Sequence, residues 1–192
     1  MKIRESGMPN EKIWDGFFNP VKILEILGMS KNICDAAEFG CGFGTFTIPA
    51  AKMISGKIYA IELVTEMLEI TRKKAIEKKL DNIVTVQRDF ITKGSGLNSE
   101  SVDYVMLFNI LHGEEPEKLF EESWRILKHN GILGIIHWNY DPKTVRGPPM
   151  EIRIKPEQCI ELGKSSGFVN SSMYDLKPYH YGIKLKKIIL KI

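Results

Sequence analysis

An acid and three alternating glycines stand close together near residue 40, and a loop of this composition could bind a cofactor. The segment reads EFGCGFG over residues 38–44. Glycines there allow tight turns and let a ligand press against bare backbone. A dinucleotide-binding loop would read GxGxxG, but Thr45 stands where its third glycine would be. Glu38 would repel a pyrophosphate and attract an ammonium, so the loop favours a ligand that carries an amino-acid ammonium group.

Short apolar segments that read as buried strands alternate with helical segments along most of the chain. The expected strands are residues 33–39, 56–63, 82–90, 101–111 and 131–138. The expected helices are residues 20–27, 65–80, 116–131, with Gly131 as its stop, and 156–166. This alternation predicts a parallel sheet with helices on both faces. The glycine loop follows the first strand, so it lies in the crevice beyond the carboxyl ends of the strands, where ligands bind in such sheets.

The end of the chain breaks this alternation. FVNSSMYDLK and YGIKLKKIIL are two strand-like runs separated only by PYH, and so short a connection forces an antiparallel pair. We therefore expect an α/β fold with a seven-stranded, mostly parallel, doubly wound sheet that ends in an antiparallel hairpin. A single domain over residues 1–192 accounts for the chain, with residues 1–30 as an N-terminal lid and helix segment and residues 31–192 as the core.

Composition and charge narrow the classes of partner. The 192 residues are 43% hydrophobic and 27% charged, with a formal net charge of +3, which is typical of a soluble globular protein without a nucleic-acid or membrane partner. The N-terminus lacks the apolar run of a signal peptide. Cys34, Cys41 and Cys159 form no CxxC pair, which favours reduced thiols in the cytoplasm over a metal site. We expect Cys34 and Cys159 to be core residues and Cys41 to fill the glycine loop.

From about residue 33 onward, the chain resembles the class I S-adenosylmethionine-dependent methyltransferases, whose first motif is an acidic residue followed by xGxGxG. EFGCGFG matches that motif at every defined position, and LFNILHG, residues 107–113, matches the motif of the fourth strand. The resemblance implies a Rossmann-like fold and S-adenosylmethionine as cofactor. It also implies that Glu62 accepts both ribose hydroxyls, that Asp89 meets the adenine amine, that Phe90 packs on the adenine ring and that Asn109 faces the methionine moiety. The full set of implied cofactor-binding residues is Glu38, Gly40, Cys41, Gly42, Gly44, Glu62, Leu63, Asp89, Phe90 and Asn109.

Methyl transfer requires a nucleophile held in line behind the methyl carbon, and it requires a general base only if the acceptor must lose a proton. His112 directly follows the motif of the fourth strand, and Tyr140 lies in the long segment after the fifth strand. We expect these two residues to be the catalytic candidates. The alternative for His112 is a loop histidine with a local hydrogen bond.

Aromatic residues and an arginine near the expected crevice are candidates for binding the acceptor: Trp14, Phe18, Trp138 and Arg146. The segment 137–156 is too long and proline-rich to be a simple connector. Arg146 is preferred to Arg153 because the sequence RGPP holds it in a stiff turn. The N-terminal aromatics could form a lid that excludes water, although packing of these rings against the helices, and a rigid loop with solvated arginines, remain alternatives.

A small-molecule acceptor is the favoured substrate. The fourth strand is followed by NILH rather than by the (N/D/S)PP(Y/F) tetrapeptide of nucleic-acid methyltransferases of this fold, and no basic stripe with interleaved aromatics is present. Two other functions stay open: a nicotinamide-dependent oxidoreductase, and a non-catalytic cofactor-binding partner subunit. The sequence also leaves open the acceptor atom, a peptide side chain as acceptor, and the oligomeric state.

Overall fold

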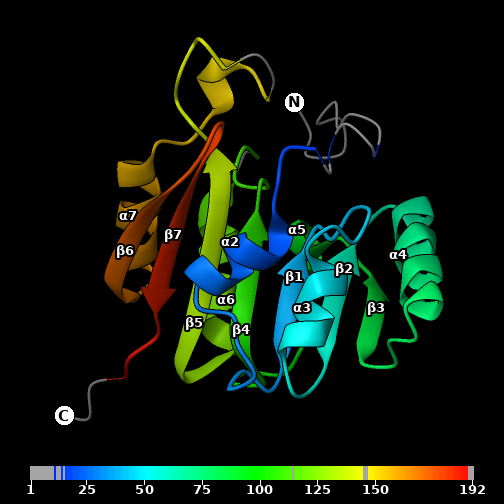
Figure 1. Ribbon diagram of the computed structural model, residues 1–192. Helices are drawn as coiled ribbons and strands as arrows, with labels where there is room; N and C mark the ends of the chain where they lie inside the picture. Colours follow the sequence, from blue (N-terminus) through cyan, green and yellow to red (C-terminus); the bar gives the residue numbers. More distant parts are fainter. Residues whose placement is uncertain (1–10, 12–13, 15, 114, 145–146, 190–192) are drawn as a thin grey trace.

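The fold is a seven-stranded sheet in the order β3-β2-β1-β4-β5-β7-β6 (Figure 1). The computed structural model describes residues 11, 14, 16–113, 115–144 and 147–189. All strand pairs are parallel except β5–β7 and β6–β7, which are antiparallel. The predicted architecture with its terminal hairpin is therefore confirmed. The strands are β1 (Ala36–Phe39), β2 (Ile58–Glu62), β3 (Ile83–Gln87), β4 (Val102–Phe108), β5 (Leu127–Trp138), β6 (Val169–Leu176) and β7 (His180–Lys186).

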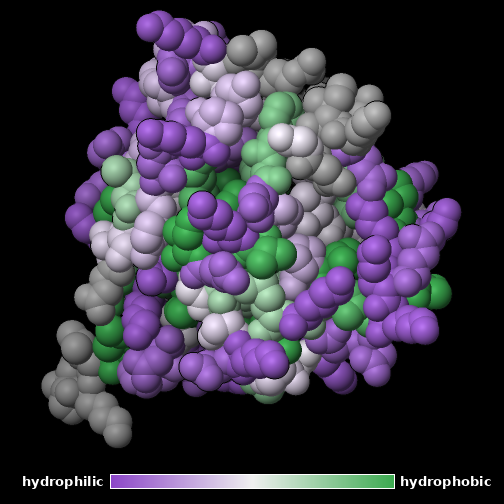
Figure 2. Space-filling model, viewed as in Figure 1, coloured by the Kyte–Doolittle hydropathy of each residue, from purple (hydrophilic) through white to green (hydrophobic). Residues whose placement is uncertain are grey.

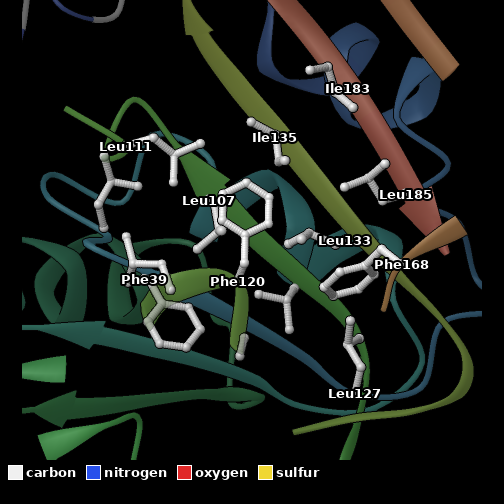
Figure 3. Close-up of a cluster of buried hydrophobic side chains, with 14 of the residues drawn as sticks. Phe39, Leu107, Leu111, Phe120, Leu127, Leu133, Ile135, Phe168, Ile183 and Leu185 are labelled. Carbon is white, nitrogen blue, oxygen red and sulfur yellow. The ribbon is translucent and has the colours of Figure 1, made fainter. Parts of the chain in front are cut away.

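Helices cover both faces of the sheet. The helices are α2 (Pro20–Ile26), α3 (Thr47–Met53), α4 (Thr65–Glu77), α5 (Phe90–Lys93), α6 (Pro116–Ile126), the 3-10 helix η2 (Met150–Ile152) and α7 (Pro156–Ser165). One apolar cluster joins α2 and α3 to one face, and a larger cluster joins α6 and α7 to the other. Figure 3 shows the larger cluster, where Phe39 of β1, Leu107 of β4 and Phe120 of α6 point into a common core. None of the described helices is long and apolar enough to span a membrane.

Two local predictions are wrong. The helix expected over residues 116–131 ends at Ile126, and Gly131 lies inside β5 rather than at a helix stop. From Ile126 onward the backbone hydrogen-bonds to residues that flank β4 and β7: Ser101 N–H donates to the Ile126 carbonyl (2.8 Å), and Lys187 N–H donates to the Gly131 carbonyl (3.0 Å). Cys34, expected in the core, is exposed because β1 begins only at Ala36, whereas Cys159 is buried as expected.

Gly134, in the middle of β5, makes room for a buried tyrosine. The Tyr104 ring crosses Gly134, and the Tyr104 hydroxyl donates a hydrogen bond to the Leu27 carbonyl (3.1 Å) at the end of α2. A Cβ atom at Gly134 would lie 2.8 Å from Tyr104 Cζ and closer still to its hydroxyl oxygen. No side chain therefore fits at position 134 unless Tyr104 moves and loses this bond.

The variant Gly134→Ala is expected to lower the free energy of unfolding by about 3 kcal/mol, the sum of overpacking and a lost buried hydrogen bond. Urea unfolding measures this change. In a Tyr104→Phe background the hydroxyl is already gone, so the same substitution should cost clearly less. Equal costs in both backgrounds would contradict the assigned clash.

Candidate cofactor and acceptor site

The glycine loop lies at the carboxyl end of β1, between the neighbours β2 and β4 at which the strand order reverses. Gly40, Gly42 and Gly44 have φ values of +73°, +50° and +75°, a region that L side chains rarely adopt. A Cβ at Gly40 would lie 3.2 Å from Ile110 Cδ1, and one at Gly44 would lie 2.9 Å from Thr71 Oγ1. The backbone of the loop therefore approaches its surroundings so closely that only glycine fits without strain.

Glu62, the last residue of β2, ties this strand to the glycine loop. Its Oε1 accepts the backbone N–H groups of Leu63 (2.7 Å) and Val64 (3.0 Å), and its Oε2 accepts that of Gly42 (3.1 Å). An ionised carboxylate has about four lone-pair sites. Glu62 thus keeps capacity to accept a further hydrogen bond from a ligand hydroxyl at the crevice.

Glu38 of β1 is a buried acid beneath the same loop. Its side chain is 3% exposed, and Thr47, the first residue of α3, donates its hydroxyl hydrogen to Glu38 Oε2. Burial raises the pKa of Glu38 to about 8, and the nearby Glu62 charge adds to this rise. The Glu38 carboxyl is therefore protonated at neutral pH in the ligand-free protein, and a cationic group beside it would restore the charged form.

The other residues expected on the cofactor side fall into two groups. Asp89 caps α5 and accepts the N–H of Thr92 (3.3 Å). Phe90 and Cys41 are buried: the Phe90 ring meets Phe39 edge-on, with ring centroids 5.4 Å apart. Burial and the acids Glu38 and Glu62 hold the pKa of the Cys41 thiol well above its usual range. Cys41 is accordingly a small, unreactive filler of the loop.

Beyond β4 lies a group of buried polar side chains whose atoms have no hydrogen-bond partner among the described residues. Asn109 follows β4 with φ +56° and is 9% exposed. Neither its amide nor either ring nitrogen of His112, His137 or His180 has a partner there. The rings of His112 and His137 lie 6.0 Å apart between centroids. Buried polar groups are normally paired, so the atoms of Asn109, His112 and His137 are candidates to bind a ligand.

The sequence singled out His112 and Asn109 from this group but gave His137 and His180 no role. Both lie on the strands that bound the crevice, where Trp138 of β5 pairs with His180 of β7 and His137 pairs with Tyr181. A histidine in the PYH turn was visible in the sequence. The register that sets it beside the end of β5 was not, because about forty residues separate the two strands.

An aromatic cluster from the N-terminal segment, α3 and the β5–β7 pair covers the same end of the sheet. The Phe18 ring lies 4.6 Å from the His180 ring, which lies 4.2 Å from the Trp138 ring. Phe18 also meets Trp14 and Phe46, each at 5.1 Å. The expected acceptor residues Trp14, Phe18 and Trp138 are therefore brought together.

The surface of the molecule is mostly hydrophilic on the face drawn in Figure 2, where hydrophobic side chains form only small groups.

Lys74 of α4 links the N-terminal segment to the glycine loop, because its ammonium contacts both. Its ammonium donates to the Phe43 carbonyl (2.7 Å) and pairs with the Glu11 carboxylate (2.5 Å). The segment therefore reaches both the cofactor side, through Glu11, and the ends of β5 and β7, through its aromatic rings.

The loop after β5 contains Tyr140, a predicted catalytic residue, and the arginines Arg146 and Arg153. Tyr140 is 47% exposed, and the Lys155 ammonium lies 4.6 Å from its ring centroid, so the structure does not bring it into the polar group around Asn109. The buried Arg153 guanidinium donates to the carbonyls of Pro148 (2.8 Å) and Asn139 (3.0 Å). Arg153 thus holds the loop in shape. Arg146 lies outside the described residues.

Comparison with known proteins agrees with this arrangement. Residues 37–135, just over half of the chain, match the methyltransferase domain family. The fold and the glycine loop define a class I methyltransferase, a class whose cofactor is S-adenosylmethionine. The chain belongs to the methyltransferase domain family.

Three known proteins illustrate how similar the chain is to other methyltransferases. An S-adenosylmethionine-dependent methyltransferase from Aquifex aeolicus shares the fold with a TM-score of 0.81 at 23% identity, over 93% of this chain and 94% of that one. A ubiquinone biosynthesis O-methyltransferase from Actinobacillus pleuropneumoniae is 27% identical over 62% of this chain and 56% of its own length. A methyltransferase-like protein from Schizosaccharomyces pombe is 31% identical over 56% of this chain and 39% of its own length. The chain thus spans only part of these two curated relatives.

Proposed function

We propose that this chain transfers a methyl group from S-adenosylmethionine to a small-molecule acceptor by in-line displacement. The observation that carries the proposal is the arrangement of Glu38, the glycine loop and Glu62 at the reversal of strand order, beside the unpartnered Asn109 amide. These residues fit the cofactor: a buried acid suits its ammonium, bare loop backbone admits it closely, and Glu62 can accept a hydrogen bond from its ribose. Asp89, at the start of α5, is assigned to the adenine amine.

The residues of the chain then have distinct tasks. When bound, S-adenosylmethionine supplies a methyl carbon on a sulfonium, whose leaving group is a neutral thioether. The protein need not stabilise a new anion there, so placement of the acceptor dominates, and orientation contributes up to ~7–11 kcal/mol in favourable cases. His112 takes the acceptor's proton where one must be lost, since burial lowers its pKa and keeps the ring neutral at neutral pH. The aromatic cluster of Trp14, Phe18 and Trp138 excludes water.

A small acceptor is supported by the aromatic cluster of Trp14, Phe18 and Trp138 at the same end of the sheet, in which Trp138 is 4% exposed. The relatives do not agree on the acceptor atom. One is an O-methyltransferase, and a structural neighbour from Haemonchus contortus, sharing 17% identity at a TM-score of 0.74, is a phosphoethanolamine N-methyltransferase. The acceptor must therefore be argued from this chain's own residues.

Isothermal titration of the purified protein with S-adenosylmethionine, S-adenosylhomocysteine and NADH tests the proposal. The two sulfur ligands are expected to bind with one site per chain, and NADH is expected not to bind. Binding of NADH alone would favour the nicotinamide-dependent oxidoreductase and overturn the proposal. Binding of the sulfur ligands without any methyl transfer across an acceptor screen would favour a non-catalytic partner subunit.

A further inference from the structure

Two imidazoles lie close together beyond the carboxyl end of β4: His137 is buried, and His112 is half-buried with both ring nitrogens inaccessible. His137 is fully buried at the end of β5. Neither ring nitrogen of His112 has a hydrogen-bond partner among the described residues, and the ring of His137 has none beyond a contact with the backbone of Trp138. A buried polar group that is left unpaired destabilises the protein. Two such rings 6.0 Å apart, next to the equally unpartnered Asn109 amide, indicate that a ligand completes their hydrogen bonds.

His180 does not belong to this pair. It pairs directly with Trp138 across β5 and β7, whereas His137 pairs with Tyr181. Residues directly opposite each other share a face of the sheet, and neighbours along a strand alternate. His137 therefore shares a face of the sheet with Tyr181. His180 lies on the other face, between the rings of Phe18 and Trp138.

The surroundings of His112 and His137 offer no counter-charge for a charged ligand group. Burial, with contributions from His112, His180 and Arg153, lowers the pKa of His137 to about 3, although a contact with the backbone of Trp138 opposes this shift. Burial also lowers the pKa of His112. Both rings are neutral at pH 7, and no carboxylate is among the described groups that shift either one. Arg153, the cation that contributes to the pKa shift of His137, already donates to loop carbonyls. An ammonium would find no counter-charge here, and a carboxylate would find no free cation.

A neutral imidazole offers one N–H donor and one acceptor nitrogen. One ring can donate to an oxygen or sulfur atom held between the two, and the other ring can accept from it. Hydrogen bonds of about 2.8–3.0 Å fit within the 6.0 Å between the ring centroids if the two bonds meet at an angle on that atom. A hydroxyl or a thiol has this combination of donor and acceptor.

We propose that His112 and His137 together bind the reacting group of the methyl acceptor, and that this group is an uncharged hydroxyl or thiol. The inference rests on the proposed function and adds the class of substrate to it. His137 is then a specificity-determining residue, because its ring selects protic, uncharged groups over ammonium and carboxylate groups.

Binding of four matched probes tests this inference without any turnover. Benzyl alcohol, benzyl mercaptan, benzylamine and benzoate share a ring and differ in the polar group, and each is titrated into protein saturated with S-adenosylhomocysteine. The side-chain NMR signals of His112 and His137 report the contact. We expect the alcohol and the thiol to produce saturable shifts of both signals, with affinities at least tenfold higher than those of the ammonium and the carboxylate.

The variant His137→Phe keeps a buried ring and removes both nitrogens. It should lower affinity for benzyl alcohol at least tenfold while S-adenosylhomocysteine binds as before. His129→Gln is the control, since His129 lies at the opposite end of β5, where its Nδ1 accepts the N–H of Ile189 (3.2 Å).

Each contrary outcome has a definite meaning. Tighter binding of benzylamine or benzoate, unchanged alcohol binding in His137→Phe, or no shift with any probe would overturn the inference alone. Failure of S-adenosylhomocysteine to bind the unmodified protein would instead overturn the proposed function.

Discussion

Replacing Glu62 with alanine is expected to weaken binding of S-adenosylhomocysteine at least a hundredfold. The carboxylate is assigned to the ribose, and a hydrogen bond to a charged group is worth about 1.5–3 kcal/mol, so the hundredfold loss, about 2.8 kcal/mol, combines this contact with the disordering of the glycine loop. The same substitution releases the N–H of Gly42, which now donates to Glu62 Oε2 at 3.1 Å. Binding therefore loses both a direct contact and a preorganised loop. Isothermal titration measures the loss.

Two further variants separate these contributions. Glu66→Ala removes an exposed acid from the first turn of α4, close by in sequence, and should leave the affinity within about twofold, as expected for a surface substitution. Glu62→Gln keeps the size of the side chain but brings an NH₂ group toward backbone donors, so it should bind nearly as poorly as Glu62→Ala. Normal binding by Glu62→Ala, with the fold intact by circular dichroism, would show that the ribose lies elsewhere.

The sheet and the cofactor side could be predicted from sequence because their signals are local. Strand-length apolar runs between helical segments defined the parallel sheet, and the three-residue PYH connection defined the antiparallel pair. An acid that ends an apolar strand, such as Glu62, also stands out without any tertiary information, because it needs a polar environment at the strand end.

The acceptor side could not be predicted in the same way because its contacts are long-range. The pairing of Trp138 with His180, and the contact of Phe18 with that histidine ring, join parts of the chain far apart in sequence. Even the start of β5 was hidden, since Ile126 continues the helical pattern of α6 and only lateral hydrogen bonds of the backbone end the helix there. Strand register and burial determine which histidines face the site, and neither can be predicted from a short segment of sequence.

Glu38→Gln is expected to change stability and cofactor binding in opposite directions. Glu38 has a folded-state pKa of about 8 against an ordinary value of 4.5. Below pH 4.5 the group is protonated in both states. As pH rises from 4.5 to 8, the unfolded chain loses this proton while the folded protein keeps it, so the contribution of Glu38 to stability falls. The 3.5-unit difference (8 − 4.5) sets an upper bound of roughly 5 kcal/mol.

Glutamine does not titrate, so the variant should gain stability relative to the unmodified protein as pH rises through this window. We expect a gain of about 3 kcal/mol at pH 9, below the upper bound because the folded protein can relax around an ionised Glu38. Urea unfolding at pH 4.5, 7 and 9 measures the gain. Glu77→Gln, which changes an exposed acid of α4, is the matched control and should show no such trend. A constant difference between Glu38→Gln and the unmodified protein at all three pH values would show that Glu38 titrates normally.

Cofactor binding should respond in the opposite sense. An ammonium beside Glu38 favours the ionised carboxylate, so binding at neutral pH releases a proton, and the measured enthalpy should vary with the ionisation enthalpy of the buffer. Glu38→Gln cannot supply the charge. It should bind S-adenosylhomocysteine at least tenfold more weakly at pH 8 and release no proton. A buried acid that lowers the stability of the empty protein and raises affinity for a cation is expected of a binding residue, since a purely structural group would gain from the neutral amide without loss. Equal affinity in the variant would assign the ammonium to another residue.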